Sequence, residues 1–201
     1  TGNKSDFEKF EKWSETVPYT WRNPLFHWTA LEMKRYFGVD DLLNKDNAAS
    51  IYAHCNELLQ TPSFKVRPLL TNMNVRAVCT TDDPLDSLEF HIAMKNEGVG
   101  PLKMLPAFRP DKFILIKNAN FASFVRQLAD ITSLSILNYD DLLTALSNRA
   151  DFFASLGCQL SDHGLEYLCA ENYTASEVDR IFKKALNGES VSQEEVHIYM
   201  S

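Results

Sequence analysis

The chain changes character at Val75-Arg76-Ala77-Val78-Cys79-Thr80-Thr81-Asp82-Asp83-Pro84. The first five residues form a β-rich run, and the polar turn after them predicts, through Asp83 and Pro84, a helix over residues 85–96. Short apolar runs also end in polar clusters within residues 102–111 and 157–164, separated by helices expected over residues 121–132 and 139–156. Three strands separated by helices pair in parallel, so the predicted fold class is α/β and predominantly helical.

The residues before this stretch are predicted to be helical throughout. A capping box of Ser5 and Glu8 begins the first helix, which ends near Pro18. Further helices are expected over residues 25–37, 46–59 and 63–72, the last bent at Pro68. At the other end, amphipathic helices are expected over residues 175–186 and 192–201. The predicted domains are therefore a helical part, residues 1–73, and a strand–helix part, residues 74–201.

Composition restricts the classes of partner. The 201 residues are 45% hydrophobic and carry a net charge of −7, with a pI near 5.2. Excess negative charge argues against a nucleic-acid or anionic-membrane surface, and no apolar run approaches the roughly 18 residues of a membrane span. We expect a cytoplasmic protein whose partner is a small molecule or a protein, with no nucleic acid and no membrane. Exposed edges of a short parallel sheet also favour self-association, so a homo-oligomer is expected.

The four cysteines show no metal-binding spacing. They stand at Cys55, Cys79, Cys158 and Cys169, without a C-x-x-C pair or a histidine at zinc-finger spacing. Four reduced thiols are predicted. Cys79 and Cys158 lie in apolar strand-like runs, where burial as a small hydrophobic residue is the expectation.

Candidate site residues follow the predicted strands, because the carboxyl ends of parallel strands form the active-site edge of α/β folds. Arg109 leaves an apolar run directly into a Pro-Asp turn, where its guanidinium could clamp a carboxylate bidentately or brace the turn by pairing with Asp111 or Asp82. Asp162 and His163 are adjacent, so only one of them need face a pocket. His163 has no companion at metal-ligand spacing, and His27, His54 and His91 are expected to be packed or surface residues.

Four blocks of the chain resemble the uronate isomerases, also called glucuronate isomerases, in the same order. They are Asn23-Pro24-Leu25-Phe26-His27-Trp28-Thr29, Thr80-Thr81-Asp82-Asp83-Pro84-Leu85-Asp86-Ser87-Leu88-Glu89, Leu105-Pro106-Ala107-Phe108-Arg109-Pro110-Asp111-Lys112 and Gly157-Cys158-Gln159-Leu160-Ser161-Asp162-His163-Gly164. That family belongs to the amidohydrolase superfamily of (β/α)8 TIM-type barrels and has a helical elaboration after the first strand. The resemblance implies a partial barrel, about strands two to four, preceded by the elaboration in residues 1–73.

The resemblance also implies an activity and roles for two residues. The activity is aldose–ketose isomerisation of D-glucuronate to D-fructuronate and of D-galacturonate to D-tagaturonate in hexuronate catabolism, through an enediol. Arg109 would bind the carboxylate of the uronate sugar, and Asp162 would be catalytic. The family is expected to use a divalent metal such as zinc, but its H-x-H pair, fifth-strand histidine and eighth-strand aspartate have no counterpart here, so no metal ligand is assigned.

These departures leave two other functions open. The chain is expected to be a central fragment that is inactive by itself, beginning after the first strand and ending before the fifth. The alternatives are an amidohydrolase-like hydrolase, which would not generally need an arginine at position 109 for a uronate, and a non-catalytic helical interaction module that retains a barrel segment.

Overall fold

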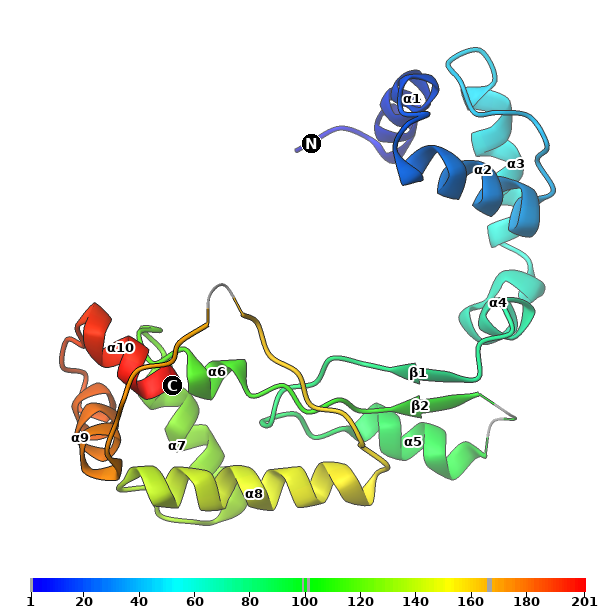
Figure 1. Ribbon diagram of the computed structural model, residues 1–201. Helices are drawn as coiled ribbons and strands as arrows, with labels where there is room; N and C mark the ends of the chain where they lie inside the picture. The colour runs from blue at the N-terminus through cyan, green and yellow to red at the C-terminus, as the bar shows by residue number, and fades with distance from the viewer. Residues whose placement is uncertain (1, 99, 101, 166–167) are drawn as a thin grey trace. The chain divides into compact units, whose positions relative to one another are not determined.

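The computed structural model describes residues 2–98, 100, 102–165 and 168–201. These residues form two compact units, Thr1–Val75 and Arg76–Ser201 (Figure 1). The boundary predicted from the sequence lies two residues earlier, after residue 73. No helix in the described ranges is both long and apolar enough to cross a membrane.

The first unit is helical. Its elements are α1 (Asp6–Thr16), η1 (Val17–Tyr19), α2 (Pro24–Phe37), α3 (Ala48–Leu59), η2 (Pro62–Phe64) and α4 (Val66–Asn72). The predicted capping box is present at Ser5, and the Asn23 side chain accepts a hydrogen bond from the N–H of Leu25 at the start of α2. Gly38 ends α2 in the left-handed region, with φ of 68°. Local capping signals therefore fix these two helices.

The core of the first unit lies between α1, α2 and α3. Its buried residues are Val17, Leu43, Ile51 and Cys55, with Phe10, Trp13, Phe26, Met33, Phe37 and Val39 packed against them. The bend predicted at Pro68 is wrong. Extended backbone at Lys65 separates η2 from α4, so Pro68 falls in the first turn of α4, where its missing N–H breaks no helical bond.

A short parallel sheet opens the second unit. Strand β1 (Ala77–Cys79) pairs with β2 (Lys103–Leu105), Val78 opposite Met104. The third strand predicted within residues 157–160 is wrong, because the structure has only an isolated bridge between Phe108 and Ser161 there. Phe108 N–H donates to the carbonyl of Leu160, but the equivalent donor two residues earlier would be Pro106, which has no N–H.

Helices form the bulk of the second unit. They are α5 (Glu89–Glu97), α6 (Asp111–Ile114), α7 (Phe121–Thr132), α8 (Tyr139–Ser155), α9 (Ala175–Leu186) and α10 (Gln193–Met200). One of them, α5, contacts β2 (Figure 1). The helix predicted from residue 85 begins four residues later, at Glu89. Asp83 and Asp86 instead close a turn, in which Asp83 Oδ1 accepts from Leu85 N–H at 2.9 Å and Asp86 Oδ2 accepts from Asp83 N–H at 2.8 Å.

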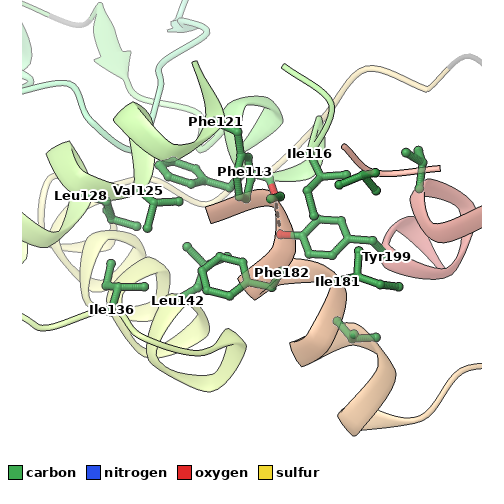
Figure 2. Close-up of a cluster of buried hydrophobic side chains, with 14 of the residues drawn as sticks. Phe113, Ile116, Phe121, Val125, Leu128, Ile136, Leu142, Ile181, Phe182 and Tyr199 are labelled. Carbon is green, nitrogen blue, oxygen red and sulfur yellow. Dashed lines mark hydrogen bonds between the residues drawn. The ribbon is translucent and has the colours of Figure 1, made fainter. Parts of the chain in front are cut away.

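The core of the second unit lies where α6, α7, α8, α9 and α10 meet (Figure 2). Phe121 and Phe182 are almost completely buried and pack edge to face, with ring centroids 6.0 Å apart. The Tyr199 hydroxyl donates to the Phe113 carbonyl at 2.9 Å, and burial raises the pKa of Tyr199. This bond ties α10 to α6, the helix that follows the end of β2.

The cysteines differ from the sequence-based expectation. All four are free, but Cys79 is exposed and Cys158 is partly buried, whereas Cys55 is the buried one. The predicted burial of Cys79 and Cys158 is therefore wrong. Ala77 and Cys79 alternate with Val78 along β1, and the side they share is exposed.

Candidate active site

Three polar segments meet at the carboxyl end of the sheet. The N–H of Arg109 donates to the carbonyl of Asp82 at 3.0 Å, and the N–H of Asp162 donates to the carbonyl of Phe108 at 3.2 Å. Parallel bridges pair Asp82 with Phe108 and Phe108 with Ser161, so the three segments lie side by side. The main chain thus brings together the strand ends that the sequence predicted to share one edge.

Arg109 lies between two carboxylates. Its Nε is 3.1 Å from Oδ2 of Asp111 and 3.2 Å from Oδ1 of Asp162. Nε and Asp111 Oδ2 are buried, and neither has a partner with hydrogen-bond geometry among the described residues, so the contact is an ion pair rather than a hydrogen bond. The side chain as a whole is 37% exposed, and no hydrogen bond from Nη1 or Nη2 is seen among the described residues. The terminal nitrogens are thus available to a ligand.

Pairing with Asp111 was one of the two bracing contacts considered for Arg109, and the structure shows it. Pairing with Asp82 is not seen in the described part of the chain, because the Asp82 side chain is directed elsewhere. Its Oδ2 accepts from Thr80 Oγ1 at 2.6 Å and from Ala107 N–H at 3.2 Å. His91, 8% exposed on α5, places Nε2 2.7 Å from Thr80 Oγ1. These residues join the ends of β1 and β2 to α5.

Asp162 and His163 behave differently. The Asp162 side chain is 66% exposed and reaches Arg109, whereas His163 is exposed and its Nδ1 lies 3.0 Å from the Gly164 carbonyl. Gly164 N–H donates to Asp111 Oδ1 at 2.7 Å. Of the two adjacent residues, Asp162 therefore joins the arginine, and Asp111 reaches both the arginine and the loop.

Two cations near the strand ends were not identified from the sequence. Lys112 Nζ is 3.4 Å from Asp83 Oδ2 and 5.0 Å from the centroid of the Phe124 ring. Arg149 on α8 is 8% exposed and donates from Nε to the Pro84 carbonyl at 2.7 Å and from Nη2 to the Asp86 carbonyl at 2.8 Å. Only the position of Lys112, directly after Arg109-Pro110-Asp111, was a sequence signal.

The described residues do not fit a metal ion. No three histidine, cysteine, aspartate or glutamate side chains within them are grouped so that they could hold one. Asp111 and Asp162 converge on a guanidinium, which already supplies their positive charge. Carboxylate recognition by Arg109 is the chemistry that this arrangement supports.

Comparison with known proteins places the whole chain in one family. Residues 1–201 match the family model described as glucuronate isomerase. The uronate isomerase of Bacteroides thetaiotaomicron is 48% identical over 193 residues, 96% of this chain and 41% of that protein. The uronate isomerase of Flavobacterium johnsoniae is 46% identical over 201 residues, 100% of this chain and 43% of that protein.

Two solved structures share this fold. The crystal structure of uronate isomerase from Thermotoga maritima superposes with a TM-score of 0.90 and 28% identity over 100% of this chain and 44% of that one. The structure of glucuronate isomerase from Caulobacter crescentus, with a TM-score of 0.88 and 22% identity, shares the fold over 98% of this chain and 41% of that one. The chain spans about two fifths of the length of the curated relatives that it matches. It belongs to the glucuronate isomerase family.

Proposed function

We propose that this chain provides part of the active site of a uronate isomerase that converts D-glucuronate to D-fructuronate and D-galacturonate to D-tagaturonate. The observation that carries the proposal is the placement of Arg109, whose Nε is buried between Asp111 and Asp162 while its terminal nitrogens donate no hydrogen bond to the described residues. A planar guanidinium with a free edge matches the two oxygens of a carboxylate.

We propose a (β/α)8 TIM-type barrel for the complete enzyme, with this chain contributing about its second to fourth strands. Parallel pairing of β1 with β2 supports this, as does the bridge from Phe108 to Ser161. The polar residues that follow these segments lie at their carboxyl ends, where barrel enzymes place catalytic groups. The helices of residues 1–73 would form the elaboration that follows the first strand.

In the proposed reaction, Arg109 binds the C6 carboxylate of the open-chain uronate and so fixes the distance to C1 and C2. The C2 proton leaves and the carbonyl oxygen O1 gains a proton as the enediol forms; O2 then loses its proton and C1 gains one as C2 becomes the ketone. Asp162 is exposed beside the arginine and would act on the reacting hydroxyl groups as a general base or acid. No step is assigned to a metal ion, since the described residues do not form a site for one.

The test uses a chimera in which this chain replaces the matching segment of the Bacteroides thetaiotaomicron uronate isomerase. The expected result is turnover of D-glucuronate and D-galacturonate, detected by NMR of the ketose product. Asp162→Asn should lower kcat by about 100-fold with a smaller effect on KM, because a general base supplies about 100- to 10,000-fold. A folded chimera without turnover, or an Asp162→Asn variant with parental kcat, would contradict the proposal.

A further inference from the structure

We infer that Asp111 is a positioning residue. It holds Arg109 and the loop that carries Asp162 in place while Asp162 moves from Arg109 to a hydroxyl group of the substrate. This inference rests on the proposed uronate isomerisation. Both carboxylates contact the same nitrogen of Arg109, at 3.1 and 3.2 Å, but the rest of the structure treats them differently.

Asp111 joins two segments that are distant in the sequence. Its Oδ2 contacts Nε of Arg109, and its Oδ1 accepts the Gly164 N–H at 2.7 Å across 53 positions of the chain. A Cβ added to Gly164 would lie 3.0 Å from that same Oδ1. The backbone of Gly164 is outside the left-handed region, so it is the closeness of the Asp111 carboxylate that crowds a side chain here.

Asp111 lies at the start of α6, and this helix is anchored in the core of the second unit. The carbonyl of Asp111 accepts from Leu115 N–H at 2.9 Å. Phe113, 2% exposed, lies in the core, and its carbonyl accepts the Tyr199 hydroxyl at 2.9 Å (Figure 2). The main chain of Asp111 is therefore held in α6, and its carboxylate is held by the Gly164 N–H.

Asp162 has no comparable support. Its side chain is 66% exposed, and its carboxylate makes no ion pair or hydrogen bond in the described ranges other than the ion pair with Arg109 Nε. When a substrate is bound, Asp162 can leave the arginine for a sugar hydroxyl without breaking another bond. Asp111 cannot, because it would lose the Gly164 N–H. Asp111 thus keeps the guanidinium edge in place during that exchange.

Asp111 helps turnover by positioning Arg109, but its negative charge should weaken binding of the substrate carboxylate. Two carboxylates beside one guanidinium leave a net negative charge where an anionic substrate must bind. Removing the charge of Asp111 should therefore strengthen carboxylate binding while it weakens turnover. Substitution of a residue that only stabilises the fold would not strengthen carboxylate binding while it lowers turnover.

The experiment compares three variants with the parental chimera. Asp111→Asn retains an oxygen for Gly164 N–H but removes the charge beside Arg109, whereas Asp111→Ala removes both contacts. Asp151→Asn, at an exposed position on α8, is the matched control. Binding of D-gluconate, an open-chain sugar acid without a carbonyl to isomerise, is measured by calorimetry, and kcat is measured with D-glucuronate.

We expect Asp111→Asn to lower kcat at least about 10-fold while it binds D-gluconate about 3- to 10-fold more tightly, and Asp151→Asn to change neither. Retention of parental kcat, or unchanged or weaker D-gluconate binding, in Asp111→Asn would overturn the inference. Arg109→Ala separates the two claims, because parental D-gluconate binding in that variant would contradict the proposed carboxylate site instead.

A second readout is independent of activity. Hydrogen exchange at the Gly164 amide, measured by NMR in the 201-residue chain, should be faster in Asp111→Ala than in Asp111→Asn, which should stay near the parental rate. Equal exchange in both variants would show that Asp111 does not hold the loop.

Discussion

Replacing Arg149 with methionine should destabilise the second unit strongly, although Arg149 is outside the strand-end site. The guanidinium donates to the carbonyls of Pro84 and Asp86 at 2.7 and 2.8 Å, and it lies 4.4 Å from the Phe152 ring centroid. A hydrogen bond to a charged group contributes about 1.5–3 kcal/mol, so two bonds give a loss of about 3 kcal/mol or more in the free energy of unfolding. Methionine keeps the apolar contacts of the arginine stem but leaves two carbonyls without their donor.

The assay is urea unfolding of the chain, followed by circular dichroism at the helix band and by tryptophan fluorescence. All three tryptophans, Trp13, Trp21 and Trp28, lie in the first unit, so fluorescence reports on that unit. With a urea m-value of about 2 kcal/mol/M, a loss of 3 kcal/mol lowers the midpoint by about 1.5 M. Circular dichroism follows both units, so the transition that it detects and fluorescence does not belongs to the second unit. The shift is expected in that transition.

Arg126→Met provides the matched control, since Arg126 is exposed on α7. Its effect should stay within about 0.5 kcal/mol, as for other surface substitutions. If Arg149→Met shifted the dichroism midpoint no more than Arg126→Met does, the two hydrogen bonds to the turn would not stabilise the fold, and the reasoning would be refuted.

Three further predictions concern the packing, the electrostatics and the backbone. Phe182→Ala should cost about 3–5 kcal/mol in urea unfolding, because Phe182 is 0% exposed at the centre of the core; a loss below 1 kcal/mol would contradict that packing. Bonds from Lys184, Ser192 N–H and Arg180 lower the pKa of Glu195 to about 2, below its usual 4.5, so the stability from this carboxylate is present above pH 4.5 and lost as the pH falls toward 2. Acid unfolding should therefore show a smaller dependence on pH between 4.5 and 2 in Glu195→Gln, and equal slopes would contradict the assignment. Gly38→Ala should cost about 1 kcal/mol, detected by tryptophan fluorescence, because φ at this position is 68°; an unchanged midpoint would show that the turn relaxes.

Helices with local end signals could be predicted from the sequence. The structure gives α7 and α9 the predicted bounds, residues 121–132 and 175–186, and the Thr174–Glu177 capping box that begins α9 is present. The start of α5 could not be predicted. Asp83 and Pro84, which resemble a helix start, instead lie in a turn that is held by hydrogen bonds from the distant Arg149 to the carbonyls of Pro84 and Asp86. Local chemistry therefore decides the helix ends unless a distant side chain satisfies the same backbone groups.

For the strands and the site, too, local features could be predicted from the sequence, whereas features that depend on distant residues could not. An apolar run predicted a strand within residues 157–160, but the ladder needs a partner N–H that Pro106 lacks. Parallel strand ends correctly predicted that Arg109 and Asp162 share one edge. The link from Asp111 to Gly164 could not be predicted, since it depends on where two loops 53 positions apart are placed by the core.

The most direct test of the carboxylate site is the ratio of kcat/KM for D-glucuronate to kcat/KM for the neutral aldose D-glucose in the chimera. If Arg109 binds the C6 carboxylate, Arg109→Ala should lower this ratio by at least about 100-fold, because charge-assisted bonds contribute about 1.5–3 kcal/mol each, and Arg109→Lys should restore only part of it. An Arg109→Ala variant that kept the parental ratio within a few-fold would contradict the account, and Arg109 would then serve only to brace the turn through Asp111.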